Sequence, residues 1–123
     1  MPLARTLTKL AFHRGGGLHL VRYVNRKAVR ILLYHGFPSE AASSWERQCQ
    51  YLRCNYKPIS LTAAVNALKA REPLPHNTVV VSVDDGYRNF HSVAYPSLKR
   101  YGIPAIVFLV SDFLDRKSWL WRR

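Results

Sequence analysis

The sequence predicts an α/β fold built on parallel strands, and three observations carry the prediction. Segments rich in β-branched and apolar residues alternate with segments of helical period along the 123 residues. The strand-like segments are apolar at consecutive positions, which is typical of strands covered on both faces. Each of them ends in a polar side chain. Parallel sheets of α/β proteins combine these features, so we expect a parallel sheet or barrel.

The first elements are two short amphipathic segments, residues 3–12 and 18–25, and then a strand over residues 28–35. A helix follows, for which Ser43 or Ser44 is the expected N-cap. Its apolar stripe has the spacing i, i+4, i+7 and i+11 and consists of Trp45, Cys49, Leu52 and Tyr56.

The alternation then continues to the end of the chain. Ser60 or Thr62 caps a second helix, whose inward side is expected to hold Leu61, Val65 and Leu68. Residues 78–83 form the strand with the strongest β propensity, and residues 105–110 form another. Between these two strands, Pro96 suits the first turn of a helix with Leu98 and Tyr101 inward, and Gly102 supplies its stop.

Charge divides the chain into a basic leader, residues 1–27, and a domain, residues 28–123. Residues 1–30 carry seven basic side chains and no acid, whereas the rest carries twelve bases and seven acids. Such a leader fits nucleic acid, an anionic membrane surface or an import signal, or a solvated helix at the edge of the domain. No apolar segment has the length of a signal-peptide core or a membrane span, so we expect a location in the cytoplasm or at the membrane periphery.

The two cysteines, Cys49 and Cys54, are expected to remain reduced. They lie five residues apart in the predicted helix, where their side chains point in well-separated directions. Cys49 belongs to the buried stripe.

Polar groups at the strand ends are the candidates for chemistry. His35 follows the first strand, Asp84 and Asp85 follow the second, and Ser111 with Asp112 follows the third. Ligands of parallel α/β folds bind at the carboxyl ends of the strands. Adjacent carboxylates repel each other, and a divalent cation would offset that repulsion. The alternative for the aspartate pair is a local turn in which Gly86 takes a positive φ.

The segment Val81-Ser82-Val83-Asp84-Asp85-Gly86-Tyr87 resembles the first motif of the polysaccharide deacetylase family, the NodB-homology domain. Its usual form is Thr/Ser-Phe-Asp-Asp-Gly, and Val83 stands where Phe is usual. Residues 33–35 and 101–109 are similar to two further segments of the family. The resemblance covers roughly residues 28–121.

This resemblance implies a partial (β/α) barrel of the NodB-homology type, from a hydrolase that removes N-acetyl groups from amino-sugar polymers. It implies Asp84 as the general base and Asp85 as a ligand of a divalent metal, most often zinc. Tyr34, His35, Gly86 and Tyr87 would line the pocket, although His35 is as well explained by a structural role at the strand end.

The family's metal-binding His-Ser/Thr-x-x-His motif is absent from this chain. His91 with Ser92 is similar to its start, but Tyr95 occupies the second ligand's position, so His91 is interpreted as a helix-surface residue. A catalytic zinc site needs three protein ligands. We therefore expect a truncated domain that binds metal weakly, is inactive alone and self-associates through exposed sheet edges.

Two other classes of function stay open. One is a basic module that holds nucleic acid or an anionic membrane through residues 1–27. Nucleic acid is disfavoured, because the aromatic residues occupy core-like positions and are not interleaved with lysines. The other is a non-catalytic subunit that pairs with a second chain.

Overall fold

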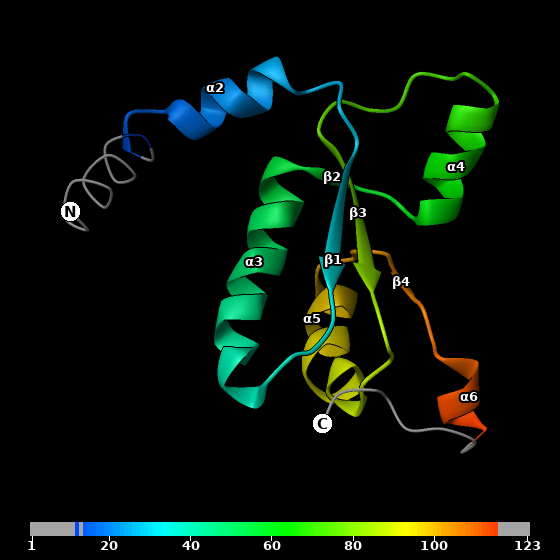
Figure 1. The fold of residues 1–123 in the computed structure, drawn as a ribbon. Helices are drawn as coiled ribbons and strands as arrows, with labels where there is room; N and C mark the ends of the chain where they lie inside the picture. Colours follow the sequence, from blue (N-terminus) through cyan, green and yellow to red (C-terminus); the bar gives the residue numbers. More distant parts are fainter. Residues whose placement is uncertain (1–11, 13, 116–123) are drawn as a thin grey trace, which may run out of the picture.

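The computed structural model describes residues 12 and 14–115. Within them the chain forms one parallel sheet with helices in the connections, as the sequence predicts (Figure 1). The elements in order are α2 (Gly17–Val24), β1 (Arg30–Tyr34), the 3-10 turn η1 (Ser39–Ala41), α3 (Ala42–Asn55), β2 (Lys57–Pro58), α4 (Leu61–Lys69), β3 (Thr78–Val83), the π-helical turn η2 (Phe90–Ala94), α5 (Tyr95–Arg100), β4 (Ala105–Val107) and α6 (Ser111–Leu114).

Strand β3 is the centre of the sheet. It pairs in parallel with β1 along one edge, and with β2 and β4 at the two ends of its other edge. All six of its residues are buried, because it has neighbours on both sides and the run of β-branched side chains fits a strand covered on both faces.

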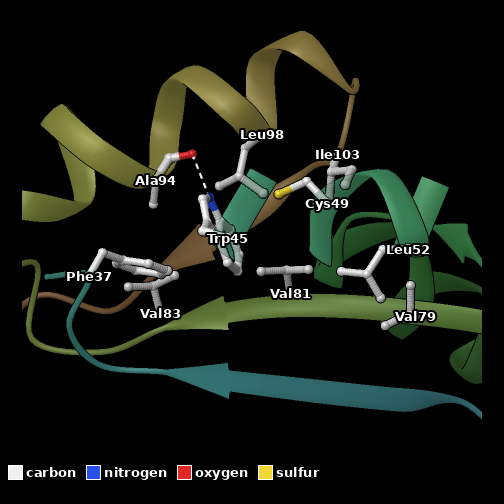
Figure 2. Close-up of a cluster of buried hydrophobic side chains, with 10 residues drawn as sticks. All are labelled: Phe37, Trp45, Cys49, Leu52, Val79, Val81, Val83, Ala94, Leu98 and Ile103. Carbon is white, nitrogen blue, oxygen red and sulfur yellow. Dashed lines mark hydrogen bonds between the residues drawn. The ribbon is translucent and has the colours of Figure 1, made fainter. Parts of the chain in front are cut away.

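The hydrophobic core lies between β3 and the helices α3 and α5 (Figure 2). Val79, Val81 and Val83 supply the sheet side of this core. From α3, Trp45 enters it and donates its Nε1–H to the carbonyl of Ala94 at 3.1 Å. This bond ties α3 to the turn before α5, and it satisfies a polar group that would otherwise be buried without a partner.

Helix α3 begins earlier than predicted, so neither Ser43 nor Ser44 is its N-cap. The turn η1 runs directly into the helix, and Ala42 N–H donates to the carbonyl of Ser39. Backbone groups of the turn thus replace the expected side-chain cap. The predicted buried stripe is confirmed for Trp45, Cys49 and Leu52, while Tyr56 lies just beyond the last turn and is half-buried.

The cysteines are free, as predicted, with Cys49 buried and Cys54 exposed. Burial raises the pKa of the Cys49 thiol to about 11, and the negative charge of Glu46 adds to the effect.

Helix α4 begins as predicted but turns a different side toward the sheet. Ser60 caps it by accepting from the backbone N–H of Ala63 at 3.1 Å. The buried residue is Ala64, and the predicted Leu61 is half-buried, whereas Val65 and Leu68 are 37% and 62% exposed. The Ile59 N–H donates to a carbonyl of β3, which fixes the chain just before the helix and so sets its rotation.

The outer strands are less covered than their apolar sequences predict. In β1, Ile31 and Leu33 are 63% and 56% exposed, because only the opposite face of this strand packs against the core. Strand β4 ends at Val107, so the predicted strand over residues 105–110 is too long, and residues 108–110 are exposed.

The helix before β4 starts ahead of Pro96. Because proline has no N–H, it cannot complete a regular α-helical bond to the preceding turn, and the wider π-helical turn η2 occupies this part of the chain. Gly102 ends the helix at φ 59°, as predicted.

At the amino-terminal end, residues 18–25 were predicted to be amphipathic, and α2 covers most of this range. The prediction for residues 3–12 falls almost wholly outside the described residues. No helix in the described part of the chain is long and apolar enough to cross a membrane.

Candidate active site

The carboxyl ends of β1 and β3 bring an imidazole and a carboxylate together. These strands pair in register, with Tyr34 opposite Val83, so the next residue on each strand lies on the same rim of the sheet. The Nε2 atom of His35 is 3.8 Å from Oδ2 of Asp84. Both groups remain open to solvent, with side chains 47% and 31% exposed.

Backbone bonds hold Asp84 in this position. Its N–H donates to the carbonyl of Tyr34 at 2.8 Å, which extends the β1–β3 ladder past the end of the strand. On the other edge, the N–H of Phe108 donates to the carbonyl of Val83 at 2.8 Å. The backbone on either side of the carboxylate is therefore anchored to two neighbouring segments.

Asp85 and Gly86 form a tight left-handed turn after Asp84. Their φ angles are 66° and 64°, and Gly86 N–H donates to the carbonyl of Asp84 at 2.8 Å. Glycine adopts this conformation without strain, and aspartate tolerates it better than most residues. A Cβ atom at Gly86 would meet the side chain of Leu109, which lies over the turn. The turn foreseen as the alternative to a metal site is thus present, directly after Asp84.

Tyr34, which was predicted to line the pocket, has its ring away from this pair. Tyr34 points to the core side, where its ring packs edge-on against Trp45 and its hydroxyl donates to Gln48 at 3.3 Å. Its pKa is raised, mainly by burial and further by nearby Cys49. Tyr87 contributes its carbonyl, which accepts from Phe90 N–H at the start of the helix.

The described cavities do not contain the His35–Asp84 pair. One of about 410 Å³ lies between β1 and α3, and Tyr34 lines it together with Arg30 and Arg47. Another of about 330 Å³ lies beside α5 and β4. Because both side chains of the pair are partly exposed, the candidate site is a solvent-accessible rim of the sheet.

One polar side chain near the rim was missed by sequence reasoning. Asn89 places its amide nitrogen 3.9 Å from the position of a Cβ atom on Gly36, directly after His35. Its Oδ1 is buried without a hydrogen-bond partner in the structure. Buried amide oxygens normally have partners, so this atom is a free acceptor behind the rim. The available signal was an asparagine close after the Asp-Asp-Gly turn.

The remaining candidates are not part of this rim pair. His91 is exposed on η2, where its ring stacks on Tyr95 at a centroid distance of 5.8 Å. Asp112 lies within the short helix α6, several residues after the end of β4.

A divalent metal is the cofactor that the strand-end carboxylates suggest. Among residues 12 and 14–115, however, no three His, Cys, Asp or Glu side chains gather closely enough to hold one. Three protein ligands are the usual requirement of a catalytic zinc site. The described residues therefore do not complete such a site, and they supply at most a part of its ligands.

Comparisons with known proteins relate the chain to carbohydrate deacetylases. Residues 71–123 match the family model described as polysaccharide deacetylase. The poly-β-1,6-N-acetyl-D-glucosamine N-deacetylase of Escherichia coli K12 is 34% identical over 80 residues. That alignment covers 64% of this chain and 12% of the relative, so the chain spans a small part of the relative's length.

Solved structures give the same relation. A de-N-acetylase from Aggregatibacter actinomycetemcomitans superposes with a TM-score of 0.62 and 30% identity, over 71% of this chain and 39% of that one. The Streptococcus pyogenes deacetylase PplD, solved with acetate, is similar in fold, with a TM-score of 0.63, 24% identity, and coverage of 73% and 46%.

Proposed function

The chain belongs to the NodB-type polysaccharide deacetylase family, of whose domain it covers a part, and on this premise we propose that its strand-end carboxylates serve the removal of N-acetyl groups from an amino-sugar polymer. The observation that carries the proposal is the 3.8 Å approach of His35 to Asp84 at the carboxyl ends of paired parallel strands. This is the end of such a sheet at which ligands bind.

Asp84 has the position of a general base. Its carboxylate is anchored through the backbone, is partly exposed, and can accept a proton from a water molecule that approaches from the open rim. His35 borders the carboxylate from the end of the neighbouring strand, with its Nε2 atom 3.8 Å from Oδ2 of Asp84. An open rim also suits a polymeric substrate, because an internal sugar can reach it without entering an enclosed pocket.

Asp85 is proposed as one metal ligand of the complete domain. Members of this family depend on a metal. Asp85 has a left-handed backbone conformation and Asp84 does not, so the two neighbouring carboxylates can have different roles. The other ligands would come from elsewhere in the complete domain, so we propose that this chain alone binds zinc weakly and releases no acetate.

A zinc titration of the 123-residue chain, followed through the ring resonances of its histidines by NMR, tests the site. We expect the His35 signals to shift in fast exchange, because zinc binds weakly beside this ring. Asp85→Asn should weaken the effect several-fold while keeping the turn, since asparagine also tolerates a left-handed φ. Asp112→Asn is the matched control, because it removes an exposed carboxylate from the short helix α6 and leaves the turn at Asp85 and Gly86 unchanged.

Two results would contradict the proposal. Zinc retained in stoichiometric amount through dialysis, or acetate released from an N-acetylglucosamine oligomer, would mean that the chain completes a site by itself. The rim would not be the metal-binding end of the sheet if zinc left the His35 resonances unchanged. The same conclusion would follow if Asp85→Asn and Asp112→Asn altered the zinc-induced shifts equally.

A further inference from the structure

Helix α2 packs with its polar side toward the rest of the protein. The guanidinium of Arg22 donates to Oδ1 of Asn55, the last residue of α3. Its other terminal nitrogen lies 2.6 Å from Nδ1 of His19, one turn earlier on the same side of α2. A surface helix usually turns its apolar side inward, so this orientation is the reverse of the common one.

The apolar side of α2 consequently faces solvent. With one residue every 100°, Leu20, Val21 and Val24 lie on one side of the helix, away from Arg22. They are 63%, 46% and 68% exposed, and no residue of α2 is buried. Phe12, which is 50% exposed, lays its ring against Gly17 on this same side. We call these four apolar side chains the α2 surface.

Only basic charges surround the α2 surface in sequence. Residues 1–30 include seven Lys and Arg side chains and no Asp or Glu. Arg14 precedes the helix and Lys27 follows it, both are exposed, and neither makes a hydrogen bond or ion pair within the described residues. Next to them, Arg26 stacks over the ring of Tyr23 with its guanidinium carbon 4.1 Å from the ring centroid.

We propose that the α2 surface is a membrane-docking element that binds anionic lipid. A helix with exposed aliphatic and phenyl groups on one side, and bases flanking it, lies in the plane of a bilayer with its apolar side among the acyl chains. The bases would then meet lipid phosphates, and the polar contact with Asn55 would hold the domain above the membrane. Lipid is favoured over a protein groove because the uniform positive charge suits a uniformly anionic surface.

Vesicle flotation of the full chain tests this proposal. We expect binding to phosphatidylcholine vesicles that contain about one quarter phosphatidylglycerol, and much weaker binding to phosphatidylcholine alone, with loss at high salt. Leu20→Ser should weaken binding about tenfold, because one leucine leaves the acyl region. Leu68→Ser is the matched control, because Leu68 is 62% exposed but belongs to α4 and not to the α2 surface, and this variant should bind as the parent does.

A second pair of variants tests the charge. Replacing Arg14 and Lys27 by Gln should weaken binding about fivefold per charge, whereas the same change at Lys69 and Lys99 should have no such effect. Circular dichroism checks that each variant keeps its helices. Equal binding to both kinds of vesicle, or equal losses in the α2 variants and their controls, would overturn the proposal. So would an oligomer that Leu20→Ser dissociates in the absence of lipid, since the surface would then be a protein interface.

Discussion

The substitution Gly86→Ala tests two features of the turn beside Asp84, its left-handed backbone and the side chain of Leu109 that lies over it. Two effects should add to the destabilisation of this variant. Alanine at a φ of 64° is strained, and its Cβ would displace the side chain of Leu109. Gly102→Ala provides the reference for the first effect, because Gly102 has a φ of 59° and no atom lies within 4 Å of its added Cβ.

The magnitudes follow from these surroundings. The left-handed conformation should destabilise each alanine variant by about 1–2 kcal/mol. Leu109 is 54% exposed and can rotate away, so its displacement loses only part of a leucine's burial, about 1 kcal/mol. Gly86→Ala should therefore lower the free energy of unfolding by about 2–3 kcal/mol, roughly 1 kcal/mol more than Gly102→Ala.

Urea denaturation at low protein concentration, followed by circular dichroism, measures both variants. Repeating Gly86→Ala in a Leu109→Ala background completes a double-mutant cycle, and there its effect should fall to that of Gly102→Ala. If Gly86→Ala and Gly102→Ala lowered the free energy of unfolding equally in both backgrounds, Leu109 would not lie over the turn. If neither variant were destabilised, the left-handed backbone at Gly86 would be refuted.

Three further predictions follow from burial and exposure. Cys54 should react with a thiol reagent at about pH 8, whereas Cys49 should react only when the protein unfolds. The free energy of unfolding should fall as pH rises from 9.0 to about 11, because the Cys49 thiol loses its proton at lower pH in the unfolded chain than in the folded one. A Cys49→Ala variant should show a smaller fall. Replacing Ile31 and Leu33 by Lys should reduce self-association in size-exclusion chromatography, because both side chains expose an apolar face of an outer strand; an unchanged elution volume would exclude this face. Deleting residues 1–26 should leave the circular dichroism of the remaining chain essentially unchanged, since no residue of α2 is buried; a wider loss of helix signal would make the leader part of the core.

Local patterns predicted much of this fold because their signals depend on near neighbours in the sequence. The β-branched run at residues 78–83 is the central strand, and the spacing of Trp45, Cys49 and Leu52 marks the buried side of α3. Ser60 and Gly102 begin and end their helices as cap chemistry predicts. The strand-end position of Asp84 also follows from sequence order alone, and the parallel pairing brings His35 to it.

The errors arise where burial depends on what lies across the sheet. Leu68 fits an inward helical position as well as Ala64 does, and only the docking of α4 on β3 decides between them. Ile31 and Leu33 are as apolar as the side chains of β3, yet they are exposed because their strand is packed on one face. The hydrophobicity of a side chain indicates that it can be buried, but it does not indicate which neighbour will cover it.

By itself, the sequence determined the α/β class and the alternation of the main strands and helices, and it offered the Asp-Asp-Gly turn as one of two alternatives, because periodicity, propensity and turn chemistry act over a few residues. It did not predict the short strand β2 or the helix α6. Tertiary structure alone decided the 3.8 Å approach of His35 to Asp84, the orphaned acceptor on Asn89 and the outward apolar side of α2. These features depend on the register of two strands and on the packing of helices against them. Both are set by contacts between residues far apart in the chain, which no local pattern encodes.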